Sequence, residues 1–217
     1  MSAFPNSPRL LKAGIVLVDP NTGAVQRVIV LQFNPDSLTR TLQAQAVRAE
    51  TQNRLEALRL TGPAIETLKL EAEIDAADQL ELPDQNFLTT LVGIHPQLAA
   101  LETIVHPPIG QLLASNTLAL SGVLEIAPVE APLSLFVWSR SRIIPMRITD
   151  FSITEEAFDP NLNPIRAKVS LGMRVLNVND LGFRDKGGNI FMAYLIQKEV
   201  LSGLSTGSLG ALGLESI

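Results

Sequence analysis

The sequence has no cysteine among its 217 residues, which excludes disulfide bonds and thiolate metal sites and fits a reducing compartment. Only two histidines are present, His95 and His106, and no HExxH-type spacing accompanies them. We therefore interpret both as packing residues at the ends of a helix rather than as metal ligands. One tryptophan and one tyrosine leave few aromatic platforms on which a sugar could stack.

The chain also lacks a concentration of positive charge and a long apolar run. Its net charge is -5 without a basic block, which argues against nucleic acid as the main partner because phosphate binding needs clustered lysine and arginine. No apolar run approaches the roughly 20 residues that cross a bilayer. The N-terminal run is broken by Gly14 and ends at Asp19-Pro20, unlike a signal peptide. With 46% hydrophobic residues the chain can bury a sizeable core, and we expect a cytoplasmic protein.

The clearest pattern is a long two-stranded hairpin from Phe151 to Leu176, with its turn in the segment DPNLNP at residues 159–164. In the second arm every other residue from Ile165 to Val175 is apolar, which predicts a strand with one buried and one solvated face. In the preceding strand the apolar parity slips by one residue near Thr149-Asp150, which predicts a β-bulge. The hairpin contains no catalytic constellation, so we interpret it as scaffold.

Shorter segments are also typical of strands. A first hairpin is predicted from residues 11–19 and 25–32, closed by a turn that contains Gly23. Residues 50–60 are ambiguous and are interpreted as a long loop or an extended β-arm, followed by a break at Thr61-Gly62-Pro63. Further strand patterns cover residues 38–48, 68–75, 122–126 and 133–138.

Two segments have helical periodicity. Apolar residues recur at helical spacing from residue 87 to 105, which predicts an amphipathic helix that is interrupted near Gly93 to Pro96 and ends at His106-Pro107-Pro108. Asn189 is predicted to cap a second helix, Ile190 to Leu201.

About eight strands and two helices without βαβ alternation predict a mainly β, α+β fold: an antiparallel barrel or sandwich with a flanking helix and a C-terminal helix. The predicted organisation is a flexible arm at residues 1–9, one domain at 10–201 with helices near 87–105 and 190–201, and a Gly/Ser/Leu-rich tail at 202–217.

Two charged clusters are candidate contact sites. Glu155 and Glu156 are adjacent on a strand, so they point to opposite faces and cannot act together as acid and base. Arg140 and Arg142 lie in an SRSR segment that could bind a carboxylate or a phosphate, or could be an exposed turn. In a multimer, the expected acidic partners on a neighbouring copy are Glu71, Glu73, Glu155 and Glu156.

No active-site motif is present in the sequence. Residues 181–188 lack the GxxxxGK[ST] pattern of a phosphate loop, and no serine nucleophile elbow occurs. We therefore predict a protein that is not an enzyme and has no cofactor or metal. The alternative of a different class is a ligand-binding β-barrel module, which would require convergent polar residues.

Three segments occur in a suggestive order. Phe33-Asn34-Pro35 follows the first hairpin, a helical segment begins near Gly93, and DPNLNPIRA begins at Asp159. In this order the chain resembles the tube-adaptor family of contractile injection systems, which are phage-tail-like particles of bacteria. The resemblance is to the tube-like N-terminal domain and extends over nearly the whole sequence. Many members continue into a LysM module, whereas this sequence ends in SGLSTGSLGALGLESI, so the function of that module is expected either to be missing here or to come from another chain.

The resemblance implies a tail-tube-like β-barrel that assembles into a six-membered ring and joins the inner tube to the spike at the baseplate. The implied partners are other copies of this chain, inner tube subunits, the spike or hub protein and other baseplate proteins, with no nucleic acid and no direct membrane insertion. The implied location is the bacterial cytoplasm, in a particle that is later released or docked at a membrane. A close alternative is an inner tube or tube-initiator subunit of the same machine.

The charged and turn residues of these segments are the candidate assembly-interface residues. They are Glu155, Glu156, Asp159, Asn161, Asn163, Arg166, Arg140, Arg142, Arg54 and Arg59.

Overall fold

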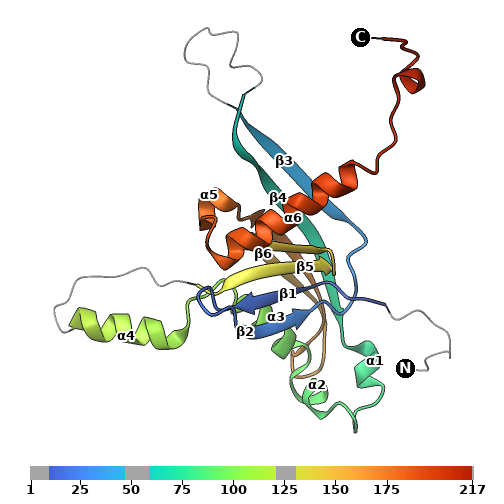
Figure 1. Ribbon diagram of the computed structural model, residues 1–217. Coiled ribbons are helices and arrows are strands. Elements are labelled where there is room, and N and C mark those ends of the chain that lie inside the picture. The colour runs from blue at the N-terminus through green and yellow to red at the C-terminus, as the bar shows by residue number, and fades with distance from the viewer. Residues whose placement is uncertain (1–9, 47–58, 121–130, 217) are drawn as a thin grey trace.

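One curved antiparallel sheet organises the molecule. The computed structural model describes residues 10–46, 59–120 and 131–216, and in them seven strands pair in the order β2-β1-β5-β6-β7-β4-β3 (Figure 1). The strands are β1 (Gly14–Val18), β2 (Val25–Val30), β3 (Leu38–Ala46), β4 (Leu60–Asp75), β5 (Leu133–Ser139), β6 (Arg142–Phe158) and β7 (Pro164–Val175).

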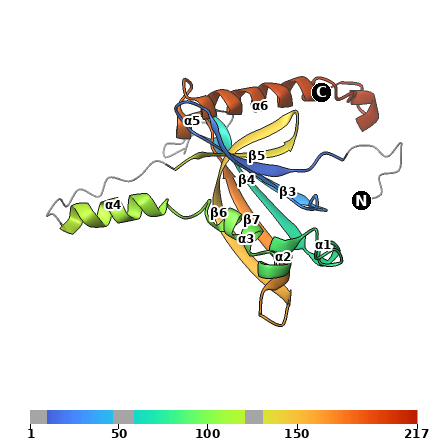
Figure 2. The ribbon, with the colours of Figure 1, turned by 90° about the horizontal axis from the view of Figure 1, so that it is seen from below.

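Helices lie at both ends of the sheet and beside it (Figure 2). They are α1 (Ala77–Leu80), α2 (Phe87–Val92), α3 (His95–Glu102), α4 (Ile109–Leu120), α5 (Val178–Leu181) and α6 (Lys186–Ser202), followed by the 3-10 turn η2 (Leu209–Leu212). The predicted mainly β, antiparallel fold with a flanking helix and a C-terminal helix is confirmed.

The core occupies one face of the sheet because apolar residues alternate along its long strands. In β7 every other residue from Ala167 to Val175 is buried, and the residues opposite Ala167 to Met173 in β4 are buried as well. Helix α3 covers part of this face with Ile94, Leu98 and Leu101. The buried residues of β4 and β7 are Leu68, Leu70, Ala72, Ile74, Ala167, Val169, Leu171, Met173 and Val175.

The predicted β-bulge is confirmed. The pairing of β6 with β7 shifts between Ile148 and Asp150, so that Asp150 lies opposite Gly172. A Cβ atom on Gly172 would lie only 2.7 Å from Oδ2 of Asp150, so glycine leaves room for the aspartate side chain at the bulge. The extra residue keeps the apolar side chains of β6 on the buried face on both sides of it.

The sheet does not close into a barrel. Strands β2 and β3 are its two edges, and no pairing joins them in the described residues. Closure would require these edges to meet with a matching stagger, whereas β2 is only six residues long. The curved open sheet therefore keeps two free strand edges.

Two local predictions are wrong, and one helix was missed. Thr61-Gly62-Pro63 is part of β4 rather than a break, since β4 is paired only with β3 at this point and the missing proline N–H is tolerated there. Helix α6 begins at Lys186 after Asp185 rather than at Asn189, since Gly187 and Gly188 let the helix start against α5. Helix α4 was not predicted at all.

Two predicted segments, the arm at 1–9 and the strand at 122–126, lie outside the described residues, as does most of the predicted loop or extended β-arm at 50–60. The division into one domain with an arm and a tail stays a prediction.

A buried carboxylate holds α6 on the sheet. Glu66 of β4 is only 3% exposed. It accepts hydrogen bonds from Tyr194 Oη at 2.9 Å, Lys198 Nζ at 2.7 Å and Arg40 Nε at 2.9 Å. The Lys198 ammonium also lies 4.1 Å from the centre of the Tyr194 ring. Burial alone would raise the pKa of Glu66, but the hydrogen bond and charge of Lys198, the Tyr194 hydroxyl and the charge of Arg40 together lower it.

We predict that Glu66→Gln destabilises the protein by about 2 kcal/mol at neutral pH, because the substitution removes the charge that two cations and a hydroxyl share. Urea unfolding of wild type and variant measures the difference. The control is Glu71→Gln on the exposed face of the same strand, with an expected change within roughly 0.5 kcal/mol.

The difference in the free energy of unfolding between wild type and Glu66→Gln should depend on pH. The pKa of Glu66 is lowered in the folded state, so the stabilisation is present above the unfolded pKa of about 4.3 and is lost as the pH falls through the lower folded value. Equal stability of wild type and Glu66→Gln at pH 7 would contradict this role.

Candidate assembly surface

The outer face of β4, β6 and β7 is polar and its charges alternate in sign across the strands. Lys168 lies opposite Glu73 of β4, and Arg166 lies opposite both Asp75 of β4 and Glu156 of β6. Lys168 Nζ is 3.2 Å from Glu156 Oε1. Opposite charges in neighbouring positions stabilise the sheet modestly and keep this face well hydrated.

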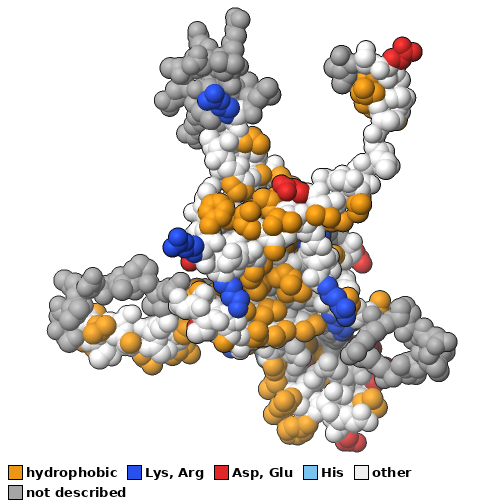
Figure 3. All heavy atoms as spheres, in the orientation of Figure 1, with side chains coloured by type: hydrophobic (Ala, Val, Ile, Leu, Met, Phe, Trp, Pro, Cys, Tyr) orange, Lys and Arg blue, Asp and Glu red, His pale blue; other side chains and the backbone are white. Residues whose placement is uncertain are grey.

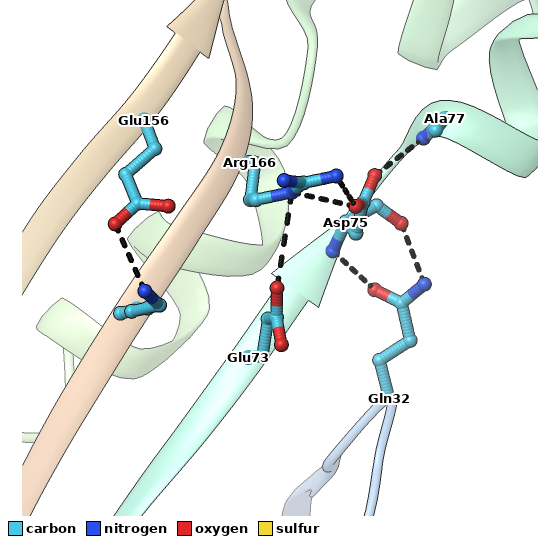
Figure 4. A network of polar contacts seen from close by, with 7 residues as sticks. Gln32, Glu73, Asp75, Ala77, Glu156 and Arg166 are labelled. Atoms are coloured by element: carbon cyan, nitrogen blue, oxygen red, sulfur yellow. Dashed lines mark hydrogen bonds and ion pairs between the residues drawn. The ribbon is translucent and has the colours of Figure 1, made fainter.

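Asp75 is the centre of a polar network at the end of β4 (Figure 4). Its Oδ2 accepts from Arg166 at 2.6 Å, and its Oδ1 accepts from the backbone N–H of Ala77 at 2.7 Å, at the start of α1. Gln32 makes two hydrogen bonds to the Asp75 backbone, of 2.6 and 3.0 Å, and so ties the chain after β2 to β4. The hydrogen bond and charge of Asp75 raise the pKa of Arg166, with Glu73 adding to the effect.

The turn of the long hairpin is held by Asp159. Its carboxylate accepts from the backbone N–H groups of Asn161 and Asn163, at 2.7 and 2.8 Å, and from the Asn163 side chain at 2.8 Å. The side-chain and backbone hydrogen bonds of Asn163 are the main causes of a lowered pKa at Asp159, and the Asn161 N–H contributes. Leu162 takes a left-handed conformation with φ of 63° and is exposed at the tip.

The same turn holds the neighbouring helices in place. Asn163 Nδ2 donates to the carbonyl oxygen of Leu91 in α2 at 3.1 Å, and the N–H of Ile94 donates to the carbonyl oxygen of Pro164 at 3.0 Å. Gly93, with φ of 60°, lies between these two contacts, and a Cβ atom there would be 2.2 Å from the Pro164 oxygen. The DPNLNP segment is therefore a brace between the hairpin and the α2–α3 connection.

The FNP segment joins two parts of the chain by hydrogen bonds, and we call it the clasp. Asn34 Oδ1 accepts from the N–H of Ala13 at 2.9 Å, and Asn34 Nδ2 donates to the carbonyl oxygen of Leu11 at 2.9 Å. The segment thus fixes the chain after β2 to the chain before β1. Both motifs that carry the family resemblance therefore stabilise the fold.

The structure brings only some of the candidate interface residues together. Glu156 and Arg166 are cross-strand neighbours near the hairpin turn, with Glu155 exposed beside them. Arg142 is instead the first residue of the 17-residue β6 and Arg140 lies in the turn before it, at the opposite end of the strand from the DPNLNP turn. Arg142 is half-buried, and its Nη2 atom has no hydrogen-bond partner in the described residues.

The remaining two candidates are in the arm between β3 and β4. Arg59 is exposed next to the start of β4, and Arg54 lies outside the described residues. The interface role of all ten candidates stays a prediction.

Sequence reasoning missed the exposed apolar surface. Large hydrophobic side chains are exposed on β2, on α4 and along the C-terminal segment. Helix α4 and the C-terminal segment project from the body of the molecule (Figure 3). One signal could have indicated α4: residues 107–124 contain no charged side chain. The exposed residues on these three elements include Val25, Val28, Val30, Ile109, Leu112, Leu113, Leu120, Leu204, Leu209, Leu212 and Leu214.

In the part of the chain that the structure describes, no group of three or more His, Asp or Glu side chains is placed to hold a metal ion. None of the helices there has the length and apolar character needed to cross a membrane.

Comparison with solved structures gives partial similarities, among them two chains of gene transfer agent particles. A chain in the tail of an empty gene transfer agent particle with C6 symmetry is 14% identical, with a TM-score of 0.29, over 76% of this chain and 90% of that chain. A chain in the virion of a native gene transfer agent particle is 12% identical, with a TM-score of 0.26, over 75% of this chain and 90% of that chain. No protein-family model and no curated protein matches the chain.

We predict that Asp159→Ala loosens the hairpin turn and the α2–α3 connection together, because the carboxylate orders Asn163 and Asn163 binds Leu91. Hydrogen exchange should become faster at residues 158–164 and at 91–94, and remain unchanged in β5.

The matched control is Asn161→Ala in the same turn, where the backbone N–H rather than the side chain contacts Asp159. Exchange that accelerates in the turn but not at residues 91–94 would disprove the brace.

Proposed function

We propose that this chain is a structural ring subunit of a contractile injection system, located at the junction of tube and baseplate, where it links the inner tube to the spike or hub. The single observation that carries the proposal is that, in the described residues, the fold leaves two strand edges unpaired and large hydrophobic side chains exposed on several elements. Surfaces of this kind are costly on an isolated soluble protein and are typical of protein–protein contacts.

The projecting end of β3 and β4 supports assembly most directly. Strand β3 is an edge strand, and seven of its nine residues are exposed. Beyond Thr67, the residue at which pairing with β7 begins, β4 pairs with β3 alone, and Figure 1 shows this two-stranded ribbon extending away from the body. Helix α6 contacts this ribbon at Glu66. A two-stranded ribbon is marginally stable in water, so we infer that a neighbouring subunit supports the part beyond that contact.

The two faces of the sheet suit a wall. One face is packed on the core, while the face of β4, β6 and β7 carries paired charges of both signs. Such a polar face can line an aqueous channel or contact a hydrated neighbour without exposing apolar surface. The open, curved sheet can be completed by the edges of neighbouring copies, and a heterologous contact closes into a ring when its rotation fits.

The family resemblance supports the placement within the machine. The FNP and DPNLNP segments, on which the resemblance rests, are the clasp and the brace that set the shape of the sheet and its helices. The same features suit an inner tube or tube-initiator subunit. These roles differ in where the chain lies in the particle, either along the tube or between the tube and the spike.

Native mass spectrometry of the purified chain tests the proposal. We expect a closed species of six copies, either alone or on addition of the tube and spike chains encoded with it. A strict monomer at high concentration, with no binding to tube or spike chains, would overturn the assembly role.

Electron cryomicroscopy of particles that contain this chain tests its place in the machine. One ring between tube and spike is the expected result. Copies repeated along the whole tube would instead establish the inner tube alternative.

A further inference from the structure

Helix α4 exposes an apolar stripe. Four of its large hydrophobic residues, Ile109, Leu112, Leu113 and Leu120, recur at the spacing of one helix face, and each is more than half exposed. The helix has no charged residue. Figures 1 and 2 both show it standing away from the sheet.

The stripe needs a partner. A helix of 12 residues is at the lower limit of what is stable in water by itself, and most helical stability in proteins comes from packing of an apolar face. No residue of α4 is buried. The half-buried residues are Gln111 and Ser115, on the opposite side of the helix. Ile109 and Leu112, at the start of the stripe, border a cavity that Arg27 and Thr103 of the same chain also line, and the stripe continues beyond it with Leu113 and Leu120.

A groove of about 400 Å³ lies between β2 and α3. One wall is the edge strand β2 with Val28 and Val30, which are both 57% exposed, and the other wall includes Ala100 and Leu101 of α3. The groove is therefore bordered by a free strand edge, and a helix laid over such an edge is one of the ways in which proteins protect it.

Both charged residues that line the groove make polar contacts within the chain. Arg27 donates a hydrogen bond to Thr103 Oγ1, and Glu73 lies 3.8 Å from Arg166. An uncharged helix can therefore enter without leaving an ion pair broken. The walls are apolar where the stripe of α4 would contact them, which is the usual arrangement for a helix that binds in a groove.

We propose that α4 of one copy docks in the β2–α3 groove of a second copy. Each copy carries one helix and one groove on different surfaces, so the contact is head-to-tail and can continue around a ring. Pro107-Pro108 separates α3 from α4 and restricts the backbone, which disfavours a return of α4 onto the groove of its own chain. The inference rests on the proposed function because it needs self-assembly, and it adds the surfaces that meet.

The absence of cysteine in the sequence permits a clean test. Leu113→Cys in one preparation and Val28→Cys in another, with tags of different size, are mixed and oxidised mildly. A disulfide between them can only join two copies. We expect about tenfold more heterodimer than with the neighbouring control Ala114→Cys, because a disulfide requires the two Cα atoms to approach within about 7 Å.

The outcomes separate the inference from the proposed function. If Leu113→Cys gives no more disulfide-linked heterodimer than Ala114→Cys while native mass spectrometry still shows a ring, the docking is wrong and the ring is unaffected. A predominant Leu113→Cys homodimer would also overturn it, since α4 would then pack on α4. A monomer by native mass would overturn both.

A second pair of variants needs no crosslink. Leu113→Asp should reduce the assembled fraction several-fold, with Ala114→Asp close to wild type, and circular dichroism checks that both fold. Equal assembled fractions for the two variants would contradict the docking. Binding of the wild-type chain to neutral lipid vesicles, lost in Leu113→Asp, would also contradict it, because the stripe would then contact lipid rather than a second copy.

Discussion

The pairing of β6 with β7 is the constraint on which the other elements depend. These two strands run together from Met146–Val175 to Phe158–Pro164, and the bulge at Asp150 keeps their apolar residues on one face along this whole length. The end of the ladder places the turn that braces α2 and α3, and β7 in turn carries β4 and its edge neighbour β3. Displacement of this register would move the polar face, the core and both sheet edges together.

Patterns local to one strand could be predicted from the sequence, whereas contacts between distant segments could not. The parity slip near Asp150 indicated the bulge because period-two alternation is a property of the strand alone. Sequence reasoning did not find the buried carboxylate of Glu66, whose partners Tyr194 and Lys198 are 128 and 132 residues away. Closure of the sheet was also out of reach, because it depends on how far the two edge strands are from each other in space.

The candidate interface residues illustrate the same limit. Arg166 was selected as a charged residue on a long hairpin, and its main partner, Asp75, is 91 residues away on β4. Asp159 and Asn163 were selected for their place in the turn, where they hold the chain to itself. A charged or turn residue in a sequence thus does not reveal whether its hydrogen bonds will be made within the chain or to another one, because both choices satisfy the same polar groups.

Apolar surface distinguishes these choices better than charge. Polar side chains that lack a partner in the protein can bind water at little cost, but the exposed leucines of α4 and the valines of β2 gain free energy only when another apolar surface covers them. The chain satisfies most of its charged hairpin internally and leaves α4, β2 and the β3–β4 ribbon uncovered. In the proposed ring, the apolar contacts between copies would come from these projections, while the polar face of β4, β6 and β7 would remain compatible with water.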